Sequence, residues 1–374
     1  MLSFGFCFRK AVFGLLPGFL LFAGAMYGQD AGTDPGASQN QISEQEYGLK
    51  AVPVLTGSTA YFTRVNAGQV QDAPSVSPLL LIPMGDRWLI EAKGSFADTF
   101  ARNTQESYEG QNNYEGSISY GMAYAQVDYI TKYVTVVAGR FTTPFGVYSE
   151  RFAPNWIRTL QVTPMISSVT SGSSLGGMLR GGIPAGTEKI NFTYAAYFSA
   201  DNTNHILATD RSTGGRIGFF LPGQRVELGA SFQQVLQADR AHSAGLYFVW
   251  QPYRAPLSVR SEFVRQSGTK GSGYWVEGVY RLSQIPSLKR VELAARAQQF
   301  YAAPNLSAST IKKLGALGKD TNQADAGLNY YLGRDVRASA SYGRQFILGR
   351  DANLWTVGMT YRFVVAAWPG GGAM

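Results

Sequence analysis

The stretch RVELGASFQQV, residues 225–235, alternates apolar and polar side chains with a period of two. Val226, Leu228 and Phe232 fall on one face of an extended chain, and Glu227 and Gln233 fall on the other. This pattern predicts a β-strand with one apolar face. The same alternation occurs in KINFTYAAYFS (189–199), SAGLYFVWQPY (243–253), PLSVRSEFVRQ (256–266), YWVEGVYRL (274–282), RVELAARAQQF (290–300), QADAGLNYYL (323–332) and NLWTVGMTYRF (353–363). The sequence therefore predicts an all-β protein.

The connections between the predicted strands differ in length. Short connections are expected at 82–87, 130–133, 183–189, 221–225, 252–256, 282–290 and 332–335. Longer polar connections are expected at 66–75, 97–116, 142–174, 200–212, 236–242, 267–272, 301–321 and 347–352. Strict alternation of the two kinds gives about sixteen antiparallel strands. This arrangement is typical of a transmembrane outer-membrane β-barrel, with short periplasmic turns and longer loops outside.

A soluble β-sandwich is the alternative, because its strands alternate too. In lipid, however, the strands must form a closed sheet so that every backbone group finds a partner. A barrel turns its apolar faces outward and leaves its charges facing a lumen. Charged residues do occur in the middle of many predicted strands: Glu91, Lys93, Arg180, Arg216, Glu227, Arg260, Glu262, Glu277, Glu292, Arg296 and Arg337. These positions favour the barrel.

The chain ends suggest export. Arg9 and Lys10 precede an apolar run that ends in small residues, so residues 1–28 are expected to be a signal peptide, cleaved after Ala25 or after Gly28. Residues 29–53 form a polar segment expected in the periplasm, residues 54–363 the barrel, and residues 364–374 a C-terminal extension. The only cysteine, Cys7, lies in the part that would be removed. The expected location is the outer membrane of a Gram-negative type of cell.

The longest predicted connection, 142–174, follows the sequence GRFTTPFG at 139–146. Pro144 cannot donate to a sheet, so the strand should stop there. A sixteen-stranded barrel is wide enough for an aqueous channel, and an inward-folded third external loop would narrow it. A simple strand-ending turn is the alternative. The residues expected to form the constriction loop are Phe141, Pro144, Phe145, Gly146, Glu150, Arg151 and Arg158.

Two segments carry a family resemblance. VVAGRFTTPFGVYSERFAP (136–154) resembles the segment with Pro-Phe-Gly after a strand in the phosphate-selective porins of the O and P type and their wider relatives. AGLNYYLGRDVRASASYGRQF (326–346), followed by NLWTVGMTYRF, is similar to their closing hairpin and final strand. The resemblance implies a trimeric sixteen-stranded channel with an inward constriction loop and a preference for anions. Thr142 stands where the family often has Lys, and the segment 142–174 contains no Lys.

The last predicted strand also carries an expected insertion signal. Outer-membrane proteins usually end on an aromatic residue, whereas this chain continues after Phe363. We expect the barrel-assembly machinery to read this signal from an internal position. Its residues are Trp355, Tyr361 and Phe363.

The charge balance favours anions. The formal charge of +8 falls by two when Arg9 and Lys10 leave with the signal peptide. A pore surrounded by arginine side chains favours anions. The glutamates of the same strands will, however, pair with some of these arginines. The arginines expected to line the pore are Arg140, Arg180, Arg216, Arg260, Arg281, Arg296, Arg337 and Arg362. Export makes nucleic acid an unsuitable partner.

Sequence motifs for an enzyme are weak. GSSLG at 172–176 matches the nucleophile-elbow pattern, but it precedes a strand instead of a helix, and His205 and His242 lie in separate loops. GALGKDT at 315–321 has the wrong spacing for a phosphate loop. No catalytic, metal or cofactor site is expected. The function expected is passive diffusion of small anionic or neutral solutes through an outer-membrane porin. The alternative is a non-conducting barrel with a structural or adhesive role.

Overall fold

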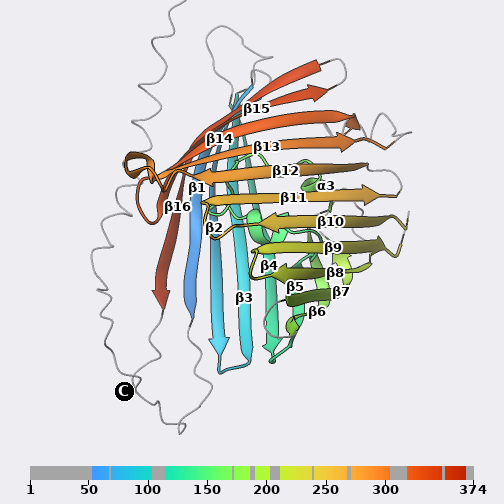
Figure 1. Ribbon diagram of the computed structural model, residues 1–374. Helices are drawn as coiled ribbons and strands as arrows, with labels where there is room; N and C mark the ends of the chain where they lie inside the picture. Colours follow the sequence, from blue (N-terminus) through green and yellow to red (C-terminus); the bar gives the residue numbers. More distant parts are fainter. Residues whose placement is uncertain are drawn as a thin grey trace, which may run out of the picture. The chain divides into compact units, whose positions relative to one another are not determined.

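The computed structural model describes residues 53–367, apart from 67–68, 103–113, 171, 186–189, 203–210, 238–239, 268–270, 304–317 and 348–349. Sixteen antiparallel strands form a closed barrel in which each strand pairs with its sequence neighbours and β16 pairs with β1 (Figure 1). The predicted fold class is therefore confirmed. The expected signal peptide and nearly all of the polar segment 29–53 lie outside the described residues.

The strand bounds are β1 Val54–Asn66, β2 Gln69–Met84, β3 Trp88–Arg102, β4 Tyr114–Ile130, β5 Val134–Thr142, β6 Ser173–Ala185, β7 Ile190–Asn202, β8 Ser212–Leu221, β9 Val226–Val235, β10 His242–Trp250, β11 Leu257–Gln266, β12 Ser272–Arg281, β13 Val291–Tyr301, β14 Thr321–Tyr331, β15 Val336–Ile347 and β16 Arg350–Ala367. Between β5 and β6 lie a π-helical turn, η1 (Tyr148–Phe152), and a short helix, α3 (Ser167–Thr170). A 3-10 turn, η2 (Pro286–Leu288), precedes β13. No helix in these ranges is both long and apolar enough to cross a membrane.

The predicted strict alternation of short and long connections is wrong at both ends of the chain. β1 ends at Asn66 and β2 begins at Gln69, so most of the expected loop 66–75 is strand. The segment QVQDAPS that opens β2 has polar residues on both faces and contains Pro74, so its sequence resembles a loop. Its backbone nevertheless pairs along β1, and the Thr63 hydroxyl donates to Asp72 at 2.6 Å.

The C-terminal strand is also longer than expected. β15 ends at Ile347 and β16 already begins at Arg350, inside the predicted connection 347–352. At its other end β16 continues to Ala367, so residues 364–367 of the expected extension belong to the strand. The remainder of that extension lies outside the described residues.

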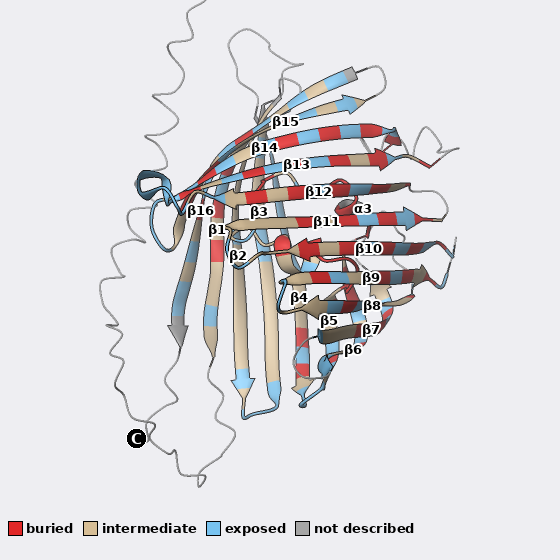
Figure 2. Ribbon diagram, viewed as in Figure 1, coloured by how far each residue is buried: buried red, intermediate tan, exposed pale blue. Residues whose placement is uncertain are grey.

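The two faces of the sheet have opposite chemistry. On β9, Leu228 and Phe232 point outward and are about half exposed, whereas Glu227, Ser231 and Gln233 point inward and are buried. Figure 2 shows this alternation of buried and exposed residues along β10 to β14, while β2 and β3 are mostly intermediate. The barrel thus presents an apolar outer face, and its core lies inside, between β10–β13 and the segment after β5.

Candidate pore constriction

The segment 143–172, which we call the inner loop, leaves the wall at the end of β5. Phe141 is fully buried, and Pro144 follows the last paired residue, Thr142. Gly146 has a φ of 62°, and a Cβ at this position would lie 2.0 Å from Oε1 of Glu262. A glycine is therefore required where the chain turns into the barrel.

Apolar packing holds the first part of the inner loop against the inside of the wall. Its buried side chains form one cluster with those of β10–β13, and the Tyr148 and Trp275 rings meet edge to face, with centroids 5.7 Å apart. The backbone N–H groups of Val147 and Tyr148 both donate to Glu262, at 3.3 and 3.5 Å. The cluster comprises Phe145, Val147, Tyr148, Phe152, Met165 and Ile166 from the loop, and Tyr247, Val249, Val264, Trp275 and Phe300 from the strands.

Two ion pairs attach the π-helical turn η1 to the wall. Arg151 donates to both carboxylate oxygens of Glu227, at 2.5 and 3.0 Å. Glu150 lies 2.5 Å from Arg216, which also donates to the Gly146 carbonyl at 2.8 Å. Burial by itself would raise the pKa of Glu150, but Arg216 and Arg151 outweigh it and hold this pKa below its ordinary value. Arg151 and Arg216 are therefore both charge-compensated.

A buried network holds the second part of the inner loop. Glu277 pairs with Arg260 and lies 3.5 Å from Arg296, which also pairs with Asp325 at 3.1 Å. The Thr159 hydroxyl of the loop donates to Glu277 at 2.5 Å, and Arg296 donates to the Val162 carbonyl. The charged side chains of this network are at most 5% exposed. These charges thus fix the loop and do not face a water-filled passage.

The side chains of the remaining predicted pore-lining arginines also have interaction partners. Arg337 donates to the carbonyls of Asn155 and Trp156, at 2.7 and 2.8 Å. Closer to the short turns, Arg281 lies over the Tyr331 ring. Two others form ion pairs: Arg180 with Asp128 at 2.6 Å, and Arg362 with Asp335 at 2.8 Å.

Arg140 differs from the other seven arginines because it points outward. Its register partners are Ala125 and Leu175, and Leu175 is 43% exposed on the apolar outer face. The nearest carboxylate oxygen, from Asp201, is 3.9 Å away. The expectation that Arg140 lines the pore is corrected by this placement. Arg140 lies four residues after the outward-facing Val136, so the period of two of a strand places both side chains on the same face.

A cavity of about 450 Å³ lies on the other side of the inner loop, against β1–β4. Arg64, Lys93 and Arg158 line it, together with Glu150. Arg158 donates to the carbonyls of Ala153 and Gln161. Within the described part of the chain, none of the three cations has a carboxylate within salt-bridge distance. Among the described residues that line this cavity, the one carboxylate, Glu150, is already paired with Arg216.

Two of these three cations were not among the predicted site residues. Arg64 lies close to the end of β1, beside a stretch that looked like a loop, and no motif marks it. Lys93 was recognisable as a charge in the middle of a strand, but nothing in its neighbourhood separated it from the ion-paired charges. Arg158 is the one predicted loop residue that brings a charge without a carboxylate partner to this cavity.

The expected insertion-signal residues share the outward face of β16. Trp355 is 53% exposed and packs on Tyr342, with ring centroids 4.4 Å apart. Val357 and Met359, on the same face, are 58% and 49% exposed, and Tyr361 and Phe363, which the period of two places there as well, are half-buried.

Ser174 has no histidine partner among the described residues. It is fully buried and shares a hydrogen bond of 2.8 Å with the Thr143 hydroxyl. The Nδ1 atom of His242 lies 2.7 Å from the Ser267 hydroxyl, and His205 falls outside the described residues. Ser174 thus helps to close the base of the inner loop.

No family model matches the sequence. No curated protein matches it either. Among solved structures, the chain is similar to OprB of Pseudomonas putida in its low-pH structure, with a TM-score of 0.52 and 10% identity over 84% of this chain and 92% of that chain. A porin of Rhodopseudomonas blastica matches with a TM-score of 0.49 and 11% identity, over 83% of this chain and 100% of the porin. The likeness to OprB shows a shared fold.

Proposed function

We propose that the protein is an outer-membrane porin through which small hydrophilic solutes diffuse passively, with a weak preference for anions. The observation that carries this proposal is the unequal pairing of charges around the cavity beside the inner loop. Arg64, Lys93 and Arg158 line it without a carboxylate partner in the described residues, whereas Glu150 is neutralised by Arg216. A passage whose free charges are of one sign concentrates counter-ions.

The preference should be weak because most of the lumen charge is compensated. The buried charged side chains on β9, β11, β12 and β13 pair with each other, with Asp325 or with the inner loop. Among the described residues that line this cavity, three cations have no carboxylate partner, and they come from β1, β3 and the loop. Phosphate and other oxyanions suit such a set, since charged donors bind them well. Neutral solutes of similar size are expected to pass as well.

The cellular setting belongs to the same proposal. Residues 1–28 would direct export and be cleaved after Ala25 or Gly28, and the short turns would face the periplasm. The barrel-assembly machinery would read Trp355, Tyr361 and Phe363, and three copies would associate in the membrane. The apolar outer face described above is suited to contact with lipid.

A planar lipid bilayer with the purified protein tests the proposal. Discrete current steps, with a reversal potential on the chloride side in a potassium chloride gradient, are the expected result. Addition of phosphate should lower the chloride current, because both ions would use the same cations. Absence of current from folded protein would contradict the proposal and favour the non-conducting structural barrel.

One observation favours that second candidate. The inner loop is fixed to the wall over most of its length by buried ion pairs and an apolar cluster. A loop held in this way could seal a barrel as well as narrow it. The size of the conductance decides between these two candidates.

A further inference from the structure

The wall of the barrel is incomplete on one side of β4. β4 pairs with β3 along nearly its whole length, from Tyr114 to Tyr129, but with β5 only from Ala125 to Ile130. No strand of the described chain pairs with the opposite edge of residues 116–124. Residues 116–122 are all exposed, with Tyr120 at 80% and Met122 at 58%. The edge is bare because β5 ends at Thr142, where the inner loop turns inward.

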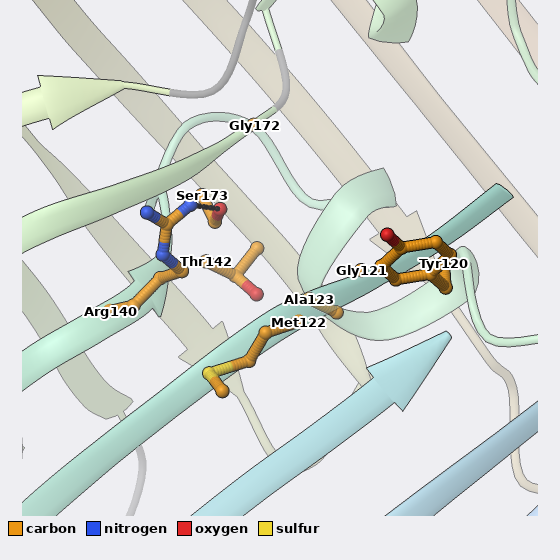
Figure 3. A pocket seen from close by; sticks show the side chains of 8 residues that line it. All are labelled: Tyr120, Gly121, Met122, Ala123, Arg140, Thr142, Gly172 and Ser173. Atoms are coloured by element: carbon orange, nitrogen blue, oxygen red, sulfur yellow. Dashed lines mark hydrogen bonds between the residues drawn. The ribbon is translucent and has the colours of Figure 1, made fainter. Parts of the chain in front are cut away.

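A cavity of about 540 Å³ occupies this gap, which we call the lateral window. It is lined by β4, β5 and the start of β6, with Tyr120 and Met122 on one side and Arg140 and Ser173 on the other (Figure 3). The window adjoins the pore cavity, since Ala123 and Thr142 line both. The lateral window therefore lies between the cation-lined cavity and the apolar outer surface of the barrel.

The chemistry of the lateral window is amphipathic. Tyr120 and Met122 offer apolar surface to a chain, and Arg140 offers a cation on the outward face. The contacts of Arg140 are long: 3.5 Å to the Ser173 hydroxyl and 3.9 Å to Asp201. Its guanidinium therefore keeps donors available. An arginine on the lipid-facing side of a barrel is unfavourable unless an anion meets it.

We propose that the lateral window binds an amphiphile with one anionic head group and an unbranched chain, and lets it pass between the pore and the membrane. Arg140 holds the phosphate, sulfonate or carboxylate head. The chain lies along the bare edge of β4, over Tyr120 and Met122. Binding does not require a conducting pore, whereas passage rests on the proposed function.

Cross-linking tests the binding site. The full barrel is placed in phosphatidylcholine vesicles that contain hexadecyl phosphate with a photoactivatable diazirine in its chain. We expect cross-links within residues 116–123 and a loss of at least about fivefold in Arg140→Gln, because the charged hydrogen bonds to the head group are removed. Asp201→Asn is the matched control: it removes the competing carboxylate, so labelling should persist or increase.

Two outcomes would overturn the binding site. The first is labelling spread evenly around the barrel or unchanged in Arg140→Gln, with folding of the variant checked by its electrophoretic mobility before and after heating. The second is absence of labelling together with disulfide-linked dimers of Ala123→Cys under oxidising conditions. That result would show that a second copy covers the window. Cys7, the only cysteine of the sequence, is replaced by serine in this variant so that the introduced cysteine is the only thiol.

A reversible closure tests the passage. Ala125 and Arg140 are the last residues paired between β4 and β5, and Ala123 and Thr142 both line the gap beyond them, so a disulfide in the double variant A123C/T142C would close the gap. Block of the chloride current by octanesulfonate should weaken about tenfold when the disulfide forms and recover on reduction. Methanesulfonate, which has the same head group without the chain, should block equally in both states. Equal block by octanesulfonate would refute the passage, and absence of any current would refute the proposed function while leaving the labelling test intact.

Discussion

Charged side chains have different roles on the two sides of the barrel interior. On β9–β14 the buried charged side chains are paired and lie beneath the inner loop, as the contacts of Glu277, Arg260 and Arg296 show. On β1–β4 a cavity separates the wall from the inner loop, and Arg64 and Lys93 line it. The same residue types therefore hold the loop in place on one wall and act on a solute on the other. What separates them is whether a partner lies within reach.

The largest effect is expected at the centre of the covered wall. Glu277→Gln leaves Arg260 buried without its carboxylate, and breaking a buried pair in this way costs about 3–5 kcal/mol. Guanidinium unfolding of the barrel in detergent would measure the change. Asp351→Asn breaks the exposed pair with Arg344, whose side chains are 50% exposed, and should cost less than about 1 kcal/mol. Equal losses in the two variants would remove the distinction between the walls.

A second prediction concerns the turn into the barrel. Gly146→Ala places a Cβ against Glu262 at a positive φ, so the start of the inner loop must shift away from the wall. We expect a strain of about 1–3 kcal/mol and a changed single-channel conductance, because the loop bounds the pore cavity. Gly223→Ala is the control, since its Cβ would meet nothing within 4 Å. An unaltered conductance in G146A would show that the loop does not set the width.

Arg151 and Arg158 lie on the same loop but should differ in their influence on ions. Arg158→Gln removes a cation from the pore cavity and should lower the chloride-to-potassium permeability ratio about twofold. Arg151→Gln should change the ratio less, because Arg151 is paired with Glu227, which does not line this cavity. Reversal potentials of the two single variants measure both permeability ratios. A larger effect in R151Q would contradict the assignment.

The smallest effect is expected from pH. Glu150 has a pKa below its ordinary value of 4.5, so its contribution to loop stability is present above that pH and is lost as pH falls through the lowered pKa. The permeability ratio should therefore stay constant from about pH 7 to 5 and shift further towards anions only at lower pH. Glu150→Gln should show the raised anion preference already at neutral pH. A step near pH 6 that disappears in E150Q would contradict this account.

The regular strands were predictable because their sequences alternate, as in Val226–Val235, whereas the polar beginning of β2 was not. The inward path of the loop was expected from its length and from the width of a sixteen-stranded barrel, and the end of β5 from Pro144. Its polar anchors could not be predicted, since the contact of Val147 with Glu262 joins residues that lie far apart in the sequence and meet only through barrel closure and register. Arg140 shows the reverse case: its period places it with Val136 and Ala138 on the outer face, so its orientation was available from the sequence.

The most direct test of the central claim removes only the unpaired cations. The triple variant R64Q/K93Q/R158Q should fold and conduct, and its reversal potential in a potassium chloride gradient should move close to zero, because the paired charges of the other wall cancel one another. A chloride preference equal to that of the unmodified protein would contradict the claim and move selectivity to the covered wall or to another part of the chain.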